Sequence, residues 1–279
     1  MFNEEVHEKL KSVDGKLGVV IRCIINSVEN TWRIVPFLIV AAYFICLIVI
    51  KSYLYDNWTT GELIKWLIVL HYTIYELLWS FFKCRKYNRK EVVEMNYERN
   101  DIYDGSDHCD TCDIDRPPRT HHCHFCKKCV TKYNHHCDFV GTCISYQNQR
   151  YFYLFMFSCL RGVICCDYYL VKLWQMFSGS ENFPFFIFLF LTLFFFNITL
   201  VIIFQTALYS VLFSVNLTLK EFVDHLKTCY DYGTIQLPLP YFKSIRKNWH
   251  EAMLIPNDKW VILGFIPFDF NFDYDFKSN

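Results

Sequence analysis

The sequence predicts an all-α integral membrane protein in which four transmembrane helices carry one small cytosolic domain of irregular or β structure. Two observations predict this fold class. First, 53% of the 279 residues are hydrophobic and 19% are aromatic, and the apolar residues lie in long blocks separated by charged blocks. Second, cysteines and histidines are crowded into one charged block. With 28 basic and 28 acidic residues the net charge is zero, and no nucleic-acid partner is expected.

The first half of the expected bundle precedes the block of cysteines and histidines. Residues 1–33 are polar and of mixed charge, and we expect them to form a cytosolic N-terminal segment. Residues 34–55 are almost all apolar and, at about 1.5 Å per residue, are long enough to cross about 30 Å of hydrocarbon, so they are the first predicted span. Residues 63–82 contain a lysine, a histidine and a glutamate. We still predict a second span there, because a membrane tolerates polar side chains that face other helices.

The second half of the bundle follows that block. Residues 83–150 are the polar block itself and the expected cytosolic domain. The third predicted span covers residues 151–174, where one arginine and one aspartate interrupt an apolar stretch. The fourth covers residues 185–210 and is rich in phenylalanine. Residues 211–279 are an amphipathic C-terminal tail with many aromatic side chains.

The distribution of lysine and arginine orients these spans. Both residue types are frequent in residues 1–33, 83–150 and 211–279 and nearly absent from the two short loops that remain. Because cytosolic loops carry the excess of positive charge, we expect both termini and the polar block to face the cytosol. The expected location is the endoplasmic reticulum, the Golgi or the plasma membrane, with the lipid bilayer as a partner.

The polar block contains a repeat. Seven of the chain's fourteen cysteines and six of its ten histidines lie between His108 and Cys143. Cysteine pairs separated by two residues and mixed with histidines are typical of zinc sites, not of a disulfide framework. A shift of fourteen positions superimposes five of these residues on five others: Cys109 on Cys123, Cys112 on Cys126, His121 on His135, His122 on His136, and Cys129 on Cys143.

Two tetrahedral zinc sites need eight ligands, and the two copies of the repeat supply them. The first set is Cys109, Cys112, His122 and Cys129, and the second is Cys123, Cys126, His136 and Cys143. Spacing does not decide between adjacent histidines, so His121 and His135 remain alternative ligands. We therefore expect the small cytosolic domain to be built on two structural zinc ions.

Cys137 belongs to neither ligand set. It stands where a third copy of the repeat would begin, but the positions that follow cannot complete a site for a soft metal. The imidazole of His135 is close to it in the chain. A single cysteine beside an imidazole on a loop stiffened by metal is the arrangement of an activated thiol nucleophile. The alternative is that Cys137 is a remnant of duplication.

The full motif reads Cys109-x2-Cys112-x3-Arg116-Pro117-x-Arg119-x2-His122-Cys123-x2-Cys126-x2-Cys129-x4-Asn134-His135-His136-Cys137 and continues to Cys143, Asn148 and Phe152. It resembles the cysteine-rich domain of the DHHC-type protein S-acyltransferases, the palmitoyltransferases, whose four-span layout is also similar. The resemblance implies zinc at the eight positions above and acylation of Cys137 from a long-chain acyl-CoA such as palmitoyl-CoA, with His135 as base. It further implies transfer of the acyl group to cytosolic cysteines of membrane-associated proteins.

Two further motifs of that family are matched in part. Thr218 and Glu221 fit its Thr-Thr-x-Glu motif after the fourth span, but Leu219 replaces the second threonine. Asn248 and Trp249 resemble its aromatic C-terminal motif. The resemblance implies that Thr218, Glu221 and Asn248 support the site.

The chain departs from the family beside the nucleophile. Asn134 stands where the family has aspartate, and Asp138 and Phe139 stand where it has proline and tryptophan. An aspartate would both fix the tautomer of His135 and stabilise the imidazolium, whereas an amide oxygen can do only the first. We therefore expect Asn134 to hold His135 in a slower enzyme. The alternative is a catalytically weak or inactive zinc-bearing membrane adaptor of the same fold.

Overall fold

The computed structural model describes residues 34–49, 59–87, 108–177, 179, 185–232 and 239–269. Four expected segments lie wholly or partly outside the described residues. They are the N-terminal segment, the end of the first expected span, residues 88–107 of the polar block, and residues 233–238 and 270–279 of the tail.

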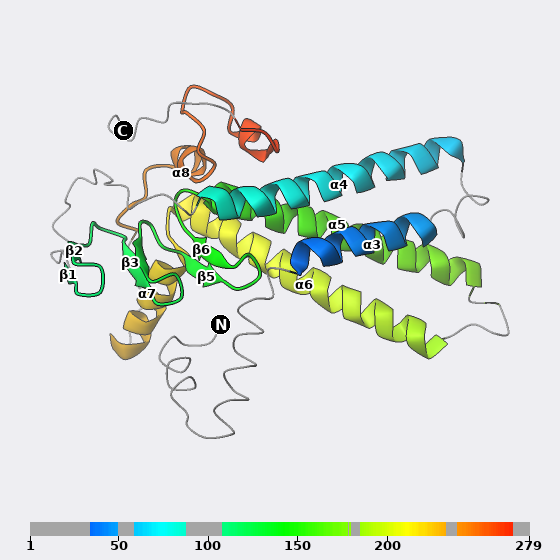
Figure 1. The fold of residues 1–279 in the computed structure, drawn as a ribbon, viewed down its shortest axis with the longest axis horizontal. Helices are drawn as coiled ribbons and strands as arrows, with labels where there is room; N and C mark the ends of the chain where they lie inside the picture. The colour runs from blue at the N-terminus through cyan, green and yellow to red at the C-terminus, as the bar shows by residue number, and fades with distance from the viewer. Residues whose placement is uncertain are drawn as a thin grey trace, which may run out of the picture.

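Four long helices form an elongated bundle in the described part of the chain (Figure 1). Helix α5 packs on α4 and on α6, and α3 packs on α4. The bounds are Val35–Val49 for α3, Thr60–Tyr87 for α4, Gln149–Phe177 for α5 and Phe185–Val215 for α6. Among the described helices, α5 and α6 are long and apolar enough to cross a membrane, over Gln149–Gln175 and Phe185–Val215.

The first two expected spans differ from the other two. The 15 residues of α3 extend about 22 Å, less than the thickness of a bilayer core, and the expected continuation to residue 55 lies outside the described ranges. Helix α4 is long enough but carries Glu76. That carboxylate is buried and forms an ion pair with Arg161 of α5, whose Nε also donates to Thr73 Oγ1 at 2.9 Å. The expectation that polar groups face other helices therefore holds for Glu76.

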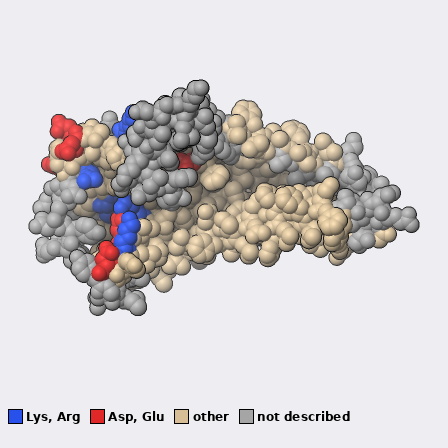
Figure 2. Space-filling view, turned by 90° about the horizontal axis from the view of Figure 1, so that it is seen from below, with Lys and Arg blue, Asp and Glu red and all other residues tan. Residues whose placement is uncertain are grey.

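Charge is unevenly distributed along the molecule. On the face shown in Figure 2, lysine, arginine, aspartate and glutamate gather at one end, and the described part of the bundle carries almost none of them. Large apolar side chains cover the bundle instead; Phe186 is 83% exposed and Phe204 69% exposed. In water such a surface would favour aggregation, whereas in a bilayer it contacts lipid.

The described part of the polar block folds as three antiparallel two-stranded hairpins, which lie at the left of Figure 1 between the labels β1 and β6. Strands this short contribute little stability on their own. The first hairpin pairs β1 (His108–Cys109) with β2 (Ile114–Asp115), the second β3 (His121–Cys123) with β4 (Lys128–Val130), and the third β5 (His135–Cys137) with β6 (Thr142–Ile144).

Local capping signals explain how the tail leaves the bundle. Asn216, with φ of 55°, follows the end of α6 in the left-handed conformation that closes many helices. Helix α7 (Leu219–Tyr232) begins at once, because Thr218 and Glu221 cap it reciprocally: Thr218 N donates to Glu221 Oε2 at 2.8 Å and Glu221 N to Thr218 Oγ1 at 3.2 Å. Ser244 caps α8 (Ile245–Ala252) in the same way, accepting from the backbone of the third helical residue.

The end of the described tail returns to the bundle. It contains a short 3₁₀ helix, η4 (Val261–Phe265), drawn in red beside α4 in Figure 1. The buried guanidinium of Arg150, at the start of α5, donates to three alternate backbone carbonyls of this segment: Gly264 at 2.9 Å, Ile266 at 3.0 Å and Phe268 at 3.1 Å. These contacts fix the backbone of this short apolar segment to the start of α5.

A Gly264→Ala variant is expected to be less stable. A Cβ at Gly264 would lie 2.6 Å from Met253 Cβ, so the tail backbone or α8 must move, and such overpacking costs about 1–3 kcal/mol. Gly61→Ala is the matched control, because nothing lies within 4 Å of its Cβ position. Thermal unfolding of the purified variants checks this; equal midpoints for the Gly264 variant and wild type would contradict the close packing.

Candidate functional site

The three hairpins are copies of one unit. Their turn residues Asp113, Lys127 and Gly141 have positive φ values of 53°, 51° and 65° and are fourteen positions apart in the sequence. The first and third turns close with the same backbone hydrogen bond, from Asp113 N to Cys109 O and from Gly141 N to Cys137 O, each at 2.7 Å. The third hairpin is therefore a repeat unit in which Cys137 occupies the position of the first ligand.

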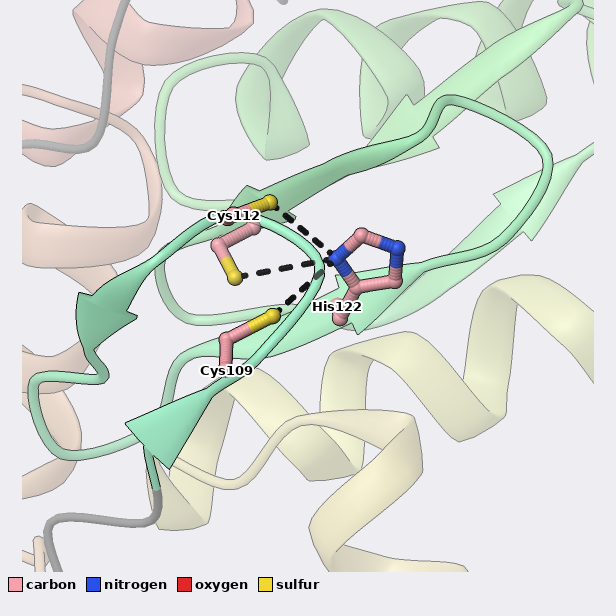
Figure 3. Close-up of side chains that lie close together, drawn as sticks. Cys109, Cys112 and His122 are labelled. Atoms are coloured by element: carbon pink, nitrogen blue, oxygen red, sulfur yellow. Dashed lines mark hydrogen bonds between the residues drawn. The ribbon is translucent and has the colours of Figure 1, made fainter.

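The first two hairpins bring one group of possible ligands together. Figure 3 shows the Sγ atoms of Cys109 and Cys112 directed at the ring of His122. The Nδ1 atom of His122 lies 3.4, 3.3 and 3.8 Å from the Sγ atoms of Cys109, Cys112 and Cys129. All four ligand atoms lie within 4.8 Å of one another.

A second group of the same composition joins the second and third hairpins. The Nδ1 atom of His136 lies 3.7, 3.4 and 3.7 Å from the Sγ atoms of Cys123, Cys126 and Cys143. A tetrahedron with Zn–S bonds of about 2.3 Å and Zn–N bonds of about 2.0 Å has edges of about 3.5–3.8 Å. Both groups therefore fit one zinc ion each, with three thiolates and one imidazole.

The two alternative histidines lie outside these groups. The ring of His121 packs against that of Tyr133, with centroids 4.9 Å apart. His135 directs Nδ1 at the hydroxyl of Tyr209. The structure therefore places His122 and His136, and not their neighbours, among the cysteines.

Cys137 lies in the hydrophobic core where the third hairpin meets the ends of α4 and α5. Burial raises the pKa of its thiol to about 11, an effect that the backbone amides of Val140 and Phe139 reduce and that Asp138 increases. The thiol is therefore protonated at neutral pH, and a nucleophilic role needs a base.

His135 can act as that base. It stands two residues before Cys137 in β5, so both side chains project from the same face of the strand, and both are buried. Burial, with a smaller contribution from His136, lowers the pKa of His135 to about 3. The imidazole is therefore neutral at neutral pH, which is the form that accepts a proton.

The expectation that Asn134 holds His135 does not match the hydrogen bonds. Asn134 Oδ1 accepts from the backbone N of Leu219, at the first turn of α7, at 3.0 Å. An orphan helix amide is a strong local donor, and it occupies the amide oxygen. The partner of His135 Nδ1 is the buried hydroxyl of Tyr209 on α6, at 2.8 Å.

Sequence reasoning missed Tyr209. In the sequence it is one tyrosine near the end of a largely apolar helix. Tyrosines are common close to membrane surfaces, so the sequence gives no sign of a role in the site.

The expected supporting residues join the hairpins to the tail. Arg119, in the loop before β3, forms a bidentate pair with Glu221, from Nε to Oε1 at 2.6 Å and from Nη2 to Oε2 at 2.8 Å. Burial opposes the ionisation of Glu221, but Arg119 outweighs it and the pKa of Glu221 is lowered. Asn248 Nδ2 donates to Ser214 O at 2.8 Å and so fixes α8 to the end of α6.

A second buried pair was not expected from the sequence. The ammonium of Lys132 donates to Glu251 Oε1 and to Asn216 Oδ1, each at 2.8 Å. Burial raises the pKa of Glu251, but Lys132 outweighs burial and lowers it to about 2. The carboxylate and ammonium therefore stay charged together at neutral pH, and Asn216 links this pair to Arg119 through its own backbone and side-chain oxygens.

Comparison with known proteins agrees with this site. Residues 102–226 match the family model described as DHHC palmitoyltransferase. No curated protein matches the chain. The matched region holds both groups of possible zinc ligands, Cys137 and helices α5 and α6. Over residues 102–226 the chain is therefore similar to the DHHC palmitoyltransferases, a family of membrane acyltransferases.

Proposed function

We propose that this protein is a protein S-acyltransferase that moves a long-chain acyl group, palmitoyl in the first instance, from acyl-CoA to cysteines of membrane-associated proteins. One observation carries the proposal. In a region that matches the DHHC palmitoyltransferase model, the two four-residue ligand groups use every cysteine between His108 and Cys143 except Cys137, and His135 lies on the same strand face as that thiol.

The reaction follows from these two side chains. His135 takes the proton from the Cys137 thiol, and the thiolate attacks the thioester carbonyl of acyl-CoA. The bond between the acyl carbon and the CoA sulfur breaks, CoA leaves with the proton from His135, and the acyl group is bonded to Cys137. His135 then takes the proton from the thiol of a substrate cysteine, whose thiolate attacks this new thioester. The bond between the acyl carbon and Cys137 Sγ breaks, and Cys137 regains the proton from His135.

The zinc groups have a structural task in this scheme. A bound ion would fix each hairpin through four ligands and leave no open coordination position for a substrate. The second group includes His136, which lies between His135 and Cys137 in β5. Its ligands therefore hold the strand that carries both reacting side chains.

The membrane arrangement is part of the proposal. We infer four spans, at residues 34–55, 63–82, 151–174 and 185–210. Both termini and the hairpins then face the cytosol. The membrane is that of the endoplasmic reticulum, the Golgi or the plasma membrane. The apolar surface of the bundle and the charged hairpin end support this arrangement (Figure 2). Cys137 packs at the cytosolic ends of α4 and α5, close to the surface where the cysteines of membrane-associated proteins lie.

The test is acyl-enzyme formation. Purified protein in lipid nanodiscs is incubated with radiolabelled palmitoyl-CoA, and the label is expected on Cys137 and to be released by neutral hydroxylamine, which cleaves thioesters. An unlabelled wild type, or a Cys137→Ser variant that labels equally, would refute the proposal. The family match does not favour the alternative of an inactive adaptor, and an unlabelled wild type with two zinc ions is the result that alternative requires.

A further inference from the structure

We propose that Tyr209 is the positioning residue for His135 in this chain, and that a phenol from membrane helix α6 takes over the task a carboxylate performs in triads of the Cys-His-Asp kind. The proposal rests on the proposed function, because it assigns His135 a proton to move. It identifies a residue that none of the sequence motifs contains.

The contact itself is short and enclosed. Tyr209 is 4% exposed and His135 9% exposed, and the hydroxyl oxygen lies 2.8 Å from Nδ1. The ring of Phe152, on α5, meets both of them edge to face, with centroids 5.3 Å from each. The imidazole is therefore held at one edge by a hydrogen bond and across its face by an aromatic ring, so it has little freedom to rotate.

The residue that precedes His135 is committed elsewhere. Asn134 gives its oxygen to the backbone N of Leu219, and this bond anchors the start of α7. It follows that the departure from aspartate at Asn134 does not leave His135 without an orienting group. The hydrogen bond between His135 and Tyr209 provides one from a different element of the fold.

The proposed role sets the direction of this bond, with Nδ1–H of His135 as the donor and the phenol oxygen of Tyr209 as the acceptor. If Nδ1–H donates to the phenol oxygen, the lone pair of His135 lies on Nε2, the free nitrogen that faces away from Tyr209 and can take the Cys137 proton. Proton transfer to Nε2 makes the ring an imidazolium, and the Nδ1–H bond to oxygen becomes stronger because its donor is now charged. A neutral phenol thus fixes the tautomer and partly stabilises the charge.

The first test removes only the hydroxyl. In full-length protein in nanodiscs, Tyr209→Phe is expected to lower the single-turnover rate of Cys137 acylation at saturating palmitoyl-CoA by about 10- to 100-fold. The concentration of palmitoyl-CoA that half-saturates the rate should not change, because the ring and the apolar packing remain. A merely structural tyrosine would change both quantities or neither.

The chain supplies a matched control. Tyr153 is also buried, and its hydroxyl bonds to Ser210 Oγ at 2.8 Å, one residue along α6 from Tyr209. Tyr153→Phe therefore removes an equivalent buried hydroxyl that does not touch His135, and its acylation rate should stay within about twofold of wild type. Equal losses in the two variants would refute the assignment.

A second variant decides the matter if Tyr209→Phe folds poorly. Monofluorotyrosine at position 209 keeps the shape and the hydroxyl but makes the oxygen a weaker acceptor. The acylation rate is then expected to fall, by less than in Tyr209→Phe; an unchanged or higher rate would overturn the proposed direction of the bond. If wild type acquires label and both variants match its rate, Tyr209 has no such role and the acyltransferase stands. If wild type acquires none, the proposed function itself fails.

Discussion

A Cys143→Ser variant is expected to lose one of two bound zinc ions, and with it the order of the third hairpin and all acylation of Cys137. Cys143 lies in β6 directly opposite His136 in β5. The two residues are therefore cross-strand partners in the third hairpin and also members of the same ligand group. A structural zinc ion contributes about 10–16 kcal/mol of apparent binding free energy at neutral pH, whereas the whole folding free energy of a domain is about 5–15 kcal/mol. Nothing else in so small a hairpin can replace it.

The measurement is zinc content per chain by elemental mass spectrometry, alongside acylation. Cys112→Ser should also lose one ion, from the other group. Cys229→Ser is the control, since Cys229 lies in α7 outside both groups and should leave both ions bound. Two ions in Cys143→Ser, or fewer than two in wild type, would contradict the assignment of ligands.

A Glu251→Gln variant is expected to lose about 3–5 kcal/mol of stability, because it leaves the ammonium of Lys132 buried without its counter-charge. Lys132 is 4% exposed, and burial lowers its pKa although Glu251 opposes this. The stability that Glu251 contributes is present above its unfolded pKa of about 4.5 and is lost as the pH falls toward its folded value of about 2. Around neutral pH the free energy of unfolding of the variant should therefore be lower than that of wild type by the full amount, independently of pH.

Denaturant unfolding at neutral pH measures this deficit. The double variant Lys132→Met with Glu251→Gln should be less destabilised than the sum of the single changes, because it leaves no unpaired charge. Asp224→Asn is the control: it breaks the Lys220–Asp224 pair, whose side chains are 37% and 45% exposed, and should cost about 0.5 kcal/mol or less. A Glu251→Gln variant as stable as this control would show that the buried pair contributes nothing.

Local patterns in the sequence predict the parts of the site that are made locally. The eight possible ligands fall into the two groups that the fourteen-residue repeat indicates, because a hairpin and its turn fix the distance between residues that are close in the chain. The apolar stretches that predict the third and fourth spans coincide with α5 and α6. Even the position of Cys137 as the first residue of a third unit has a structural counterpart in Gly141 and its turn.

The parts that could not be predicted join residues far apart in the chain. Tyr209 and His135 are 74 positions apart, and Lys132 and Glu251 are 119 apart. No periodicity or spacing connects such pairs, and their side chains meet only after the helices have packed. Asn134 illustrates the opposite error. The family's aspartate at this motif position suggested a bond between Asn134 and His135, but the oxygen of Asn134 accepts from the backbone of Leu219 in α7.

The return of the tail to Arg150 sets an order of events during synthesis. A ribosome releases the hairpins and α5 long before the carbonyls of Gly264, Ile266 and Phe268 exist, so the nascent chain can bind both metal ions while Arg150 and Lys132 still await their C-terminal partners. The strand that carries His135 and Cys137 can therefore bind metal through His136 before the C-terminal contacts form. A chain that stops before Gly264 would therefore lack these three contacts, while its hairpins would still carry both groups of possible zinc ligands.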